Sequence, residues 1–235
     1  MARRPPQLSL PLPERPGWGG RRKNAGRKPA GPRAGLPHVA RQAFRILPAH
    51  VTLRLRADLP SLRTLRVVRE IERTFAAGCA RPDFRLVHYS LQGNHAHLIV
   101  EAHDRDALGR GMMAIGARLA RAVNRVADRT GRVVADRYHA RLLPTPKEVR
   151  HALRYVLLNA RRHAVKAHAA LRRAVRLDPA SSARWFDGWK RGVPDADEVT
   201  RPAALERPAV ARARTWLLRV GWRRHGLLDP ADVPG

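Results

Sequence analysis

Apolar and polar residues alternate in four stretches of the chain, and such alternation is typical of β-strands. The predicted strands are residues 50–56, 84–91, 95–102 and 133–143. Three other stretches repeat apolar residues at the spacing of helices: 60–77, 105–129 and a segment that starts at Pro146. The short turn 92–94 predicts that the second and third strands form a hairpin.

The resulting order, β-α-β-β-α-β-α, predicts an α+β fold. It is the ferredoxin-like arrangement, a four-stranded antiparallel sheet with two helices on one face. The last helix is an addition, and apolar islands beyond residue 168 predict a small helical C-terminal extension. The second face of the sheet is left open or is covered by these additions, so we look for a functional site there.

Residues 1–37 have a different character from the rest. They hold eight prolines and nine Lys or Arg residues against the single acid Glu14, with few apolar residues. Such a segment cannot bury enough apolar surface to offset its ordering entropy, and we expect a disordered basic tail. We therefore divide the chain into this tail, a domain over 38–168 and a basic extension over 169–235.

The most unusual property of the chain is its positive charge. The chain has 47 Lys and Arg against 19 Asp and Glu, a formal net charge of +28 and a sequence pI near 11.9. A field of this sign attracts polyanions, so nucleic acid is the predicted partner, although a solubilising basic surface is the simpler alternative. In the tail, the predicted DNA-binding residues are Arg21, Arg22, Lys23, Arg27, Lys28 and Arg33. The run 26–33 could insert its arginines into a minor groove, or the tail could be a disordered basic arm without that role.

The single cysteine, Cys79, excludes an internal disulfide and a four-cysteine zinc site. No apolar run is long enough to cross a membrane, and no apolar signal core follows the basic N-terminus. These features predict a cytoplasmic, nucleoid-associated protein with no membrane partner.

The third predicted strand carries candidate chemistry. His95 and His97 are two residues apart, so both side chains leave the same face, whereas Ala96, Leu98 and Val100 point into the core. Two imidazoles so placed can hold one divalent ion between them. The alternative is a pair of surface histidines on a hairpin.

The last predicted helix adds a second set of polar residues. Thr145 to Glu148 form a capping box with proline at the first helical position, which fixes where the helix begins. His151, Tyr155, Asn159 and His163 then recur every four residues as a polar stripe opposite an apolar face. This pattern puts the hydroxyl of Tyr155 outside the core, beside an amide that can reach a metal.

Together these motifs resemble a known family. The strand with His95-Ala96-His97 and the helix with Tyr155 and Asn159 some 60 residues later resemble the single-tyrosine HUH transposases, in particular the REP-associated tyrosine transposases. The segment 136–141, which includes Arg137, is also similar to that branch. The resemblance covers residues 50–165, and it departs at Ala96, where the family has a larger apolar residue. The tail and the C-terminal region lie outside it.

The resemblance implies an activity. Tyr155 would be the nucleophile that cleaves and rejoins single-stranded or hairpin DNA through a 5′-phosphotyrosine intermediate. His95, His97 and Asn159 would hold the Mg²⁺ or Mn²⁺ that the family uses, whereas ligand softness alone points to zinc. Arg137 and Arg154 are further candidate DNA contacts. The protein would be a transposase or an endonuclease domesticated for chromosomal repeats, and a homodimer fits that family.

Two other functions stay open at this stage. The first is a DNA- or RNA-binding module that kept the fold without cleavage. The second is an RNA-binding protein of RRM type, which shares the layout but displays aromatic residues on its central strands. Four tryptophans after residue 168 could stack on bases, or they could pack a helical appendage onto the sheet: Trp185, Trp189, Trp216 and Trp222.

Overall fold

The computed structural model of the 235-residue chain describes residues 46–167, 177–190 and 207–234. The predicted tail and its six candidate DNA-binding residues lie outside this part. These described residues all belong to one compact unit. Within the described ranges no helix is long and apolar enough to span a bilayer.

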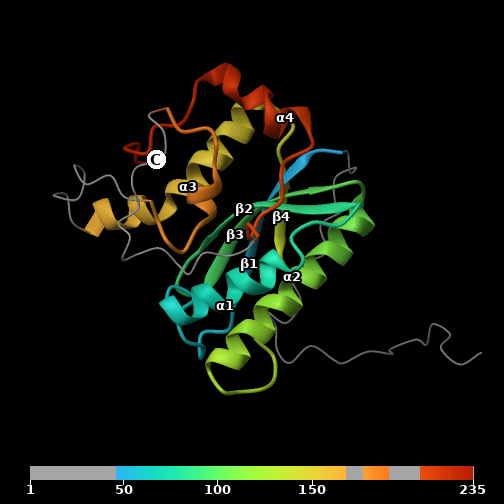
Figure 1. Cartoon of the computed structure of the whole chain (residues 1–235), viewed down its shortest axis with the longest axis vertical. Coiled ribbons are helices and arrows are strands. Elements are labelled where there is room, and N and C mark those ends of the chain that lie inside the picture. The colour runs from blue at the N-terminus through green and yellow to red at the C-terminus, as the bar shows by residue number, and fades with distance from the viewer. Residues whose placement is uncertain (1–45, 168–176, 191–206, 235) are drawn as a thin grey trace, which may run out of the picture. The chain divides into compact units, whose positions relative to one another are not determined.

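Four antiparallel strands form the central sheet: β1 (Pro48–Arg54), β2 (Phe84–Leu91), β3 (His95–Ala102) and β4 (His139–Leu142). Their order is β2-β3-β1-β4, so the strand with the two histidines is central and pairs with β1 and β2. This is the predicted ferredoxin-like sheet, and the α+β class is confirmed (Figure 1).

The fourth strand is shorter than the predicted 133–143. Val134 bridges to Leu55, but regular pairing with β1 resumes only at His139, which faces Thr52. Four residues on this side therefore face two residues on β1, and the extra length cannot stay in register. The alternating pattern continues through the interruption, which is why it predicted one long strand.

Helices α1 (Leu65–Ala76) and α2 (Arg105–Val126) cover one face of the sheet (Figure 1). Their apolar sides meet Ala96, Leu98 and Val100, which are completely buried as predicted. Both helices are shorter than their predicted ranges. The segment before α1 is a loop that carries the fully buried Leu62, whose N–H donates to the carbonyl of Gly93.

The other face is covered by α3 (Pro146–Ala167) and by parts of the C-terminal extension. These parts are η2 (Ser182–Trp185), α4 (Trp216–Arg219) and η4 (Gly221–His225). Trp222 and Trp189 are buried in a second core with Ile99 of β3, so both serve packing. Trp216 is 48% exposed. Among the described residues, the centre of the sheet at Ile99 is thus covered, whereas an RRM binds RNA on the exposed face of its central strands.

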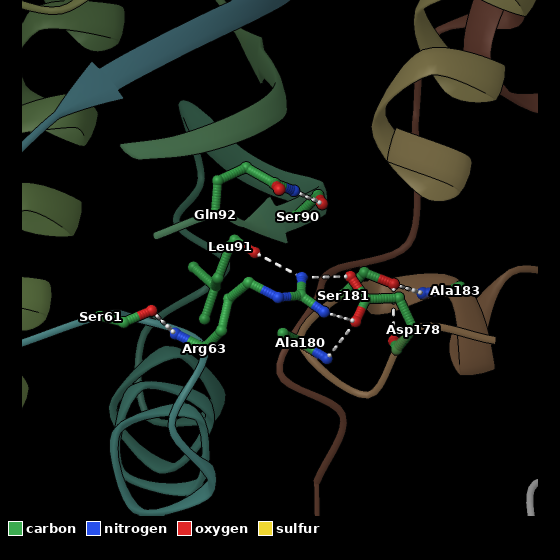
Figure 2. A network of polar contacts seen from close by, with 9 residues as sticks. All are labelled: Ser61, Arg63, Ser90, Leu91, Gln92, Asp178, Ala180, Ser181 and Ala183. Carbon is green, nitrogen blue, oxygen red and sulfur yellow. Dashed lines mark hydrogen bonds and ion pairs between the residues drawn. The ribbon is translucent and has the colours of Figure 1, made fainter. Parts of the chain in front are cut away.

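Several ion pairs and hydrogen bonds fix the extension to the domain. Figure 2 shows Arg63, just before α1, paired with Asp178 at 2.8 Å while its guanidinium also donates to the carbonyl of Leu91. In β3 the buried carboxylate of Glu101 accepts hydrogen bonds from the backbone N–H groups of Arg214 and Thr215, each at 2.8 Å. The extension is therefore held next to the start of α1 and at the end of β3.

The third attachment is on α3. Arg150, Arg154 and Arg161 each donate to a backbone carbonyl in the last ten residues, at 2.9, 2.8 and 3.0 Å respectively. Arginine on this helix, which the sequence assigned partly to DNA, thus binds the C-terminal segment of the same chain.

Candidate active site

His95 and His97 lie side by side on the covered face of β3. Their ring centroids are 4.8 Å apart and the rings are nearly perpendicular. His97 is buried, whereas His95 is half-buried and has Nδ1 3.0 Å from the side-chain oxygen of Asn94. This contact makes Nδ1 of His95 the donor, so a metal would bind through Nε2. The predicted common face is confirmed.

The neighbouring strand β1 adds two residues that the sequence did not single out. Nε2 of His50 and Oγ1 of Thr52 each lie 3.3 Å from Nδ1 of His97. Burial, together with the charges of His139 and Arg141, lowers the pKa of His50 to about 4. His50 is therefore neutral at pH 7, so its Nε2 can accept a hydrogen bond from the Nδ1–H of His97. In that tautomer Nε2 of His97 carries no proton and could bind a metal.

Tyr155 reaches the same place from α3. Its hydroxyl lies 3.4 Å from Nε2 of His97, and the two rings meet edge to face with centroids 5.0 Å apart. The ring of His50 is 5.7 Å away. The predicted nucleophile and one predicted metal ligand are thus adjacent, although 58 residues separate them in the chain.

Asn159 lies one turn after Tyr155 and differs from its expected setting. The polar stripe was expected on the outside of the helix, but Asn159 is 1% exposed because α3 packs against both the sheet and η4. Among the described residues, neither the oxygen nor the nitrogen of its side-chain amide has a hydrogen-bond partner. A buried amide without a partner costs about 1–3 kcal/mol, so it needs an explanation.

The other two tyrosines are on the opposite side of the sheet. Tyr89 is completely buried and donates to Glu72 of α1 at 2.6 Å, and burial with this carboxylate raises its pKa well above the usual range. Tyr138 packs against the core under α1 and α2. Of the three, Tyr155 is the one on the face that carries His95 and His97.

The donor set fits a divalent ion in part. Two imidazoles and an unpartnered buried amide are suitable ligands, and the amide oxygen is of the kind that Mg²⁺ and Mn²⁺ accept. Within the described ranges, however, no three His, Cys, Asp or Glu side chains are grouped to hold an ion. An ion here would need Asn159 and solvent or substrate oxygens to complete its shell.

The two predicted DNA contacts within the described part differ. Arg137 is exposed, and its backbone N–H donates to the side chain of Asp136. Arg154 is half-buried, pairs with Asp232 at 3.3 Å and donates to the carbonyl of Val233. A DNA contact by Arg154 would have to share its guanidinium with the C-terminal segment.

No protein-family model matches this sequence, and neither does any curated protein. Among solved structures, a REP-associated tyrosine transposase bound to a REP hairpin is similar to 77% of this chain over its full length, with 16% identity and a TM-score of 0.48. The second is a protein from Deinococcus radiodurans R1 that is provisionally named a transposase. It covers 45% of this chain and 85% of its own length, with 16% identity and a TM-score of 0.33. The first of these carries the name of the family that the His95, His97 and Tyr155 motifs resemble.

Proposed function

We propose that this chain is a transposase-like enzyme that cleaves and rejoins single-stranded or hairpin DNA with Tyr155 as nucleophile. The observation that supports it is the 3.4 Å contact between the Tyr155 hydroxyl and Nε2 of His97. A DNA-binding protein needs neither a tyrosine beside a histidine pair nor a buried amide without a partner.

The reaction would form one bond and break another at the same phosphorus. The Tyr155 oxygen attacks the scissile phosphate, the bond from phosphorus to the 3′-oxygen breaks, and the 5′-phosphate stays on the tyrosine. The proton that the phenol loses is balanced by one that the leaving 3′-oxygen gains. Attack by a free 3′-hydroxyl reverses the step, so strands can be rejoined without further energy.

His95, His97 and Asn159 would hold a Mg²⁺ or Mn²⁺ ion, which when bound acts as a Lewis acid on the phosphate. His50 and Thr52 would orient His97 through its Nδ1. Such outer contacts fix the ring and the tautomer of a ligating histidine. Tyr155 packs against the same ring, so the position of the nucleophile would be fixed relative to the ligating histidine.

Incubation of the protein with labelled hairpin and unstructured DNAs plus Mn²⁺ tests the proposal. We expect a covalent protein–DNA adduct that survives denaturation and carries the label on the 5′-phosphate side of the cut. Excess EDTA should abolish it, and blunt duplex DNA should give none. Efficient cutting in EDTA would contradict the role of the ion.

The second candidate is a DNA- or RNA-binding module of the same fold without cleavage. It is favoured by the absence, within the described ranges, of three His, Cys, Asp or Glu side chains grouped for an ion. Tight DNA binding with no adduct on any substrate would support this alternative.

A further inference from the structure

A pocket of about 280 Å³ lies next to Tyr155. Tyr155 and His50 form part of its wall, and the other lining residues are Arg141, Leu143, Glu148, His151 and Ala152. His95, His97 and Asn159 do not line it, so the pocket adjoins the candidate active site without being part of the metal-binding set. Its size is near the low end for ligand pockets, about 300–1,000 Å³, and suits one nucleotide rather than a length of strand.

The lining divides by chemistry. Leu143 and Ala152 are buried and apolar, whereas Arg141 and His151 are exposed donors on different elements. Arg141 projects from β4, on the same sheet face as its register partner His50, because the two residues face each other across the strands. His151 precedes Tyr155 by one turn of α3, so donors flank the phenol from the strand and from the helix.

Glu148 is the only acid in the lining, and it already has partners. Its carboxylate lies 3.0 Å from the guanidinium of Arg141 and accepts from the hydroxyl of Thr145 at 2.8 Å. The side chain of Arg141 is nevertheless 66% exposed, so most of its donors face water. An exposed pair of this kind stabilises a fold by only about 0–1 kcal/mol, which leaves the arginine available to a phosphate.

We propose that this pocket binds the nucleotide that adjoins the phosphate attacked by Tyr155. Arg141 and His151 would donate to its phosphate oxygens, and Leu143 and Ala152 would pack against its sugar or base. Glu148 competes with the DNA for Arg141 and thereby limits affinity. The idea rests on the function proposed above, because it takes Tyr155 as the reacting group.

The two partners of the ion pair should then have opposite effects on DNA affinity. Binding would be measured in the Tyr155→Phe background and in EDTA, with a fluorescent hairpin that carries a single-stranded arm and with a twelve-residue oligothymidylate. Arg141→Ala should weaken binding about tenfold, since a charge-assisted hydrogen bond is lost, and should lower the salt slope by about one. Glu148→Gln keeps the bond from Thr145 and should tighten binding about threefold.

A second ion pair provides the matched control. Arg110 and Asp83 lie 2.7 Å apart with 55% and 32% of their side chains exposed, close to the values of 66% and 30% for Arg141 and Glu148. Arg110→Ala and Asp83→Asn therefore measure the general effect of one charge on a protein of net charge +28. The proposal is overturned if Arg141→Ala and Glu148→Gln shift the dissociation constant no more than these controls do.

The two proposals can fail separately. If the wild type forms no adduct but the Arg141 and Glu148 effects remain, the cleavage proposal is wrong and the pocket is a nucleotide-binding site without a reacting phosphate. If the adduct forms and each pocket variant changes the dissociation constant only as much as its own control does, the pocket assignment is wrong and the nucleophile stands. His151→Ala should also weaken DNA binding. If it does not, His151 is not a phosphate contact and only the strand residue Arg141 keeps that role.

Discussion

Tyr138 and Tyr155 lie on opposite faces of the same sheet. Tyr138 packs beneath α1 and α2, whereas Tyr155 contacts His97 beneath α3. Both belong to the segments that resemble the transposase motifs, so either could be named as a nucleophile from the sequence. The sheet itself separates Tyr138 from the histidine pair.

Tyr155→Phe should therefore abolish the covalent adduct, and Tyr138→Phe should leave it. The first change removes one oxygen whose single described contact is 3.4 Å long, so folding and DNA affinity should be unchanged within about 0.5 kcal/mol. Denaturing gel electrophoresis with labelled DNA measures the adduct, and thermal unfolding checks the fold. If the Tyr155→Phe protein still forms the adduct, the nucleophile is another residue.

Asn159→Leu should have effects of opposite sign with and without metal. In EDTA the apolar side chain relieves an unpartnered buried amide and should raise the free energy of unfolding by about 1 kcal/mol. With Mn²⁺ the wild type should gain stability by binding the ion, and the variant should gain little. Thermal unfolding at several Mn²⁺ concentrations measures both effects.

His103→Ala is the control for the metal experiment. His103 follows β3 directly, its side chain is 70% exposed, and its ring lies 3.5 Å from the carboxylate of the adjacent Asp104. This variant should keep the full response to Mn²⁺. If Asn159→Leu keeps the response as well, the amide is not a ligand and its burial needs another cause.

Glu101→Ala should loosen the C-terminal extension. The buried carboxylate accepts two backbone N–H groups and the hydroxyl of Thr215, and its removal leaves those donors without a partner. We expect a loss of about 3 kcal/mol in unfolding free energy, and about half of that for Glu101→Gln, which keeps one acceptor oxygen. Urea unfolding measures the loss, and limited proteolysis between residues 207 and 234 should become faster. An unchanged cleavage rate would show that the segment is held mainly by its arginine contacts.

His88 should make the fold sensitive to acid. Burial lowers its pKa to about 4 from an ordinary value near 6.5, so the unfolded chain binds more protons than the folded chain between these values. The free energy of unfolding should then fall as pH drops from 6.5 to 4, by about 3 kcal/mol from this residue. His88→Gln should flatten that slope, although His50, whose pKa is also lowered, keeps part of it. Equal slopes in the variant and the wild type would mean that His88 is protonated in the folded state.

The sequence predicted the order of the elements and the common face of His95 and His97 because both follow from residue spacing alone. The sequence did not predict a role for His50, because only the register between β1 and β3 places this residue beside His97. His50 faces Ile99, and its ring reaches diagonally to His97. No periodicity within one strand specifies which residue of another strand lies beside it.

Asn159 was mislocated for a related reason. Helical spacing places it correctly relative to Tyr155, but the burial of a helix face depends on what packs there from elsewhere in the chain. Part of the cover comes from beyond residue 177, where the sequence predicts a small helical extension but not the residues against which it packs. The same coverage explains why His97 and Asn159 are buried although an exposed polar stripe was expected on α3.

The three arginines of α3 that hold the C-terminal segment limit which chimeras and truncations of this protein would keep the structure of α3. Because they flank Tyr155 on its own helix, the last ten residues act as a brace for the nucleophile. A chimera that exchanged the extension for that of a relative would have to exchange the outer side of α3 with it. A stop codon that removed residues 226–234 would remove the carbonyls that these arginines contact, although those residues lie far from α3 in the sequence.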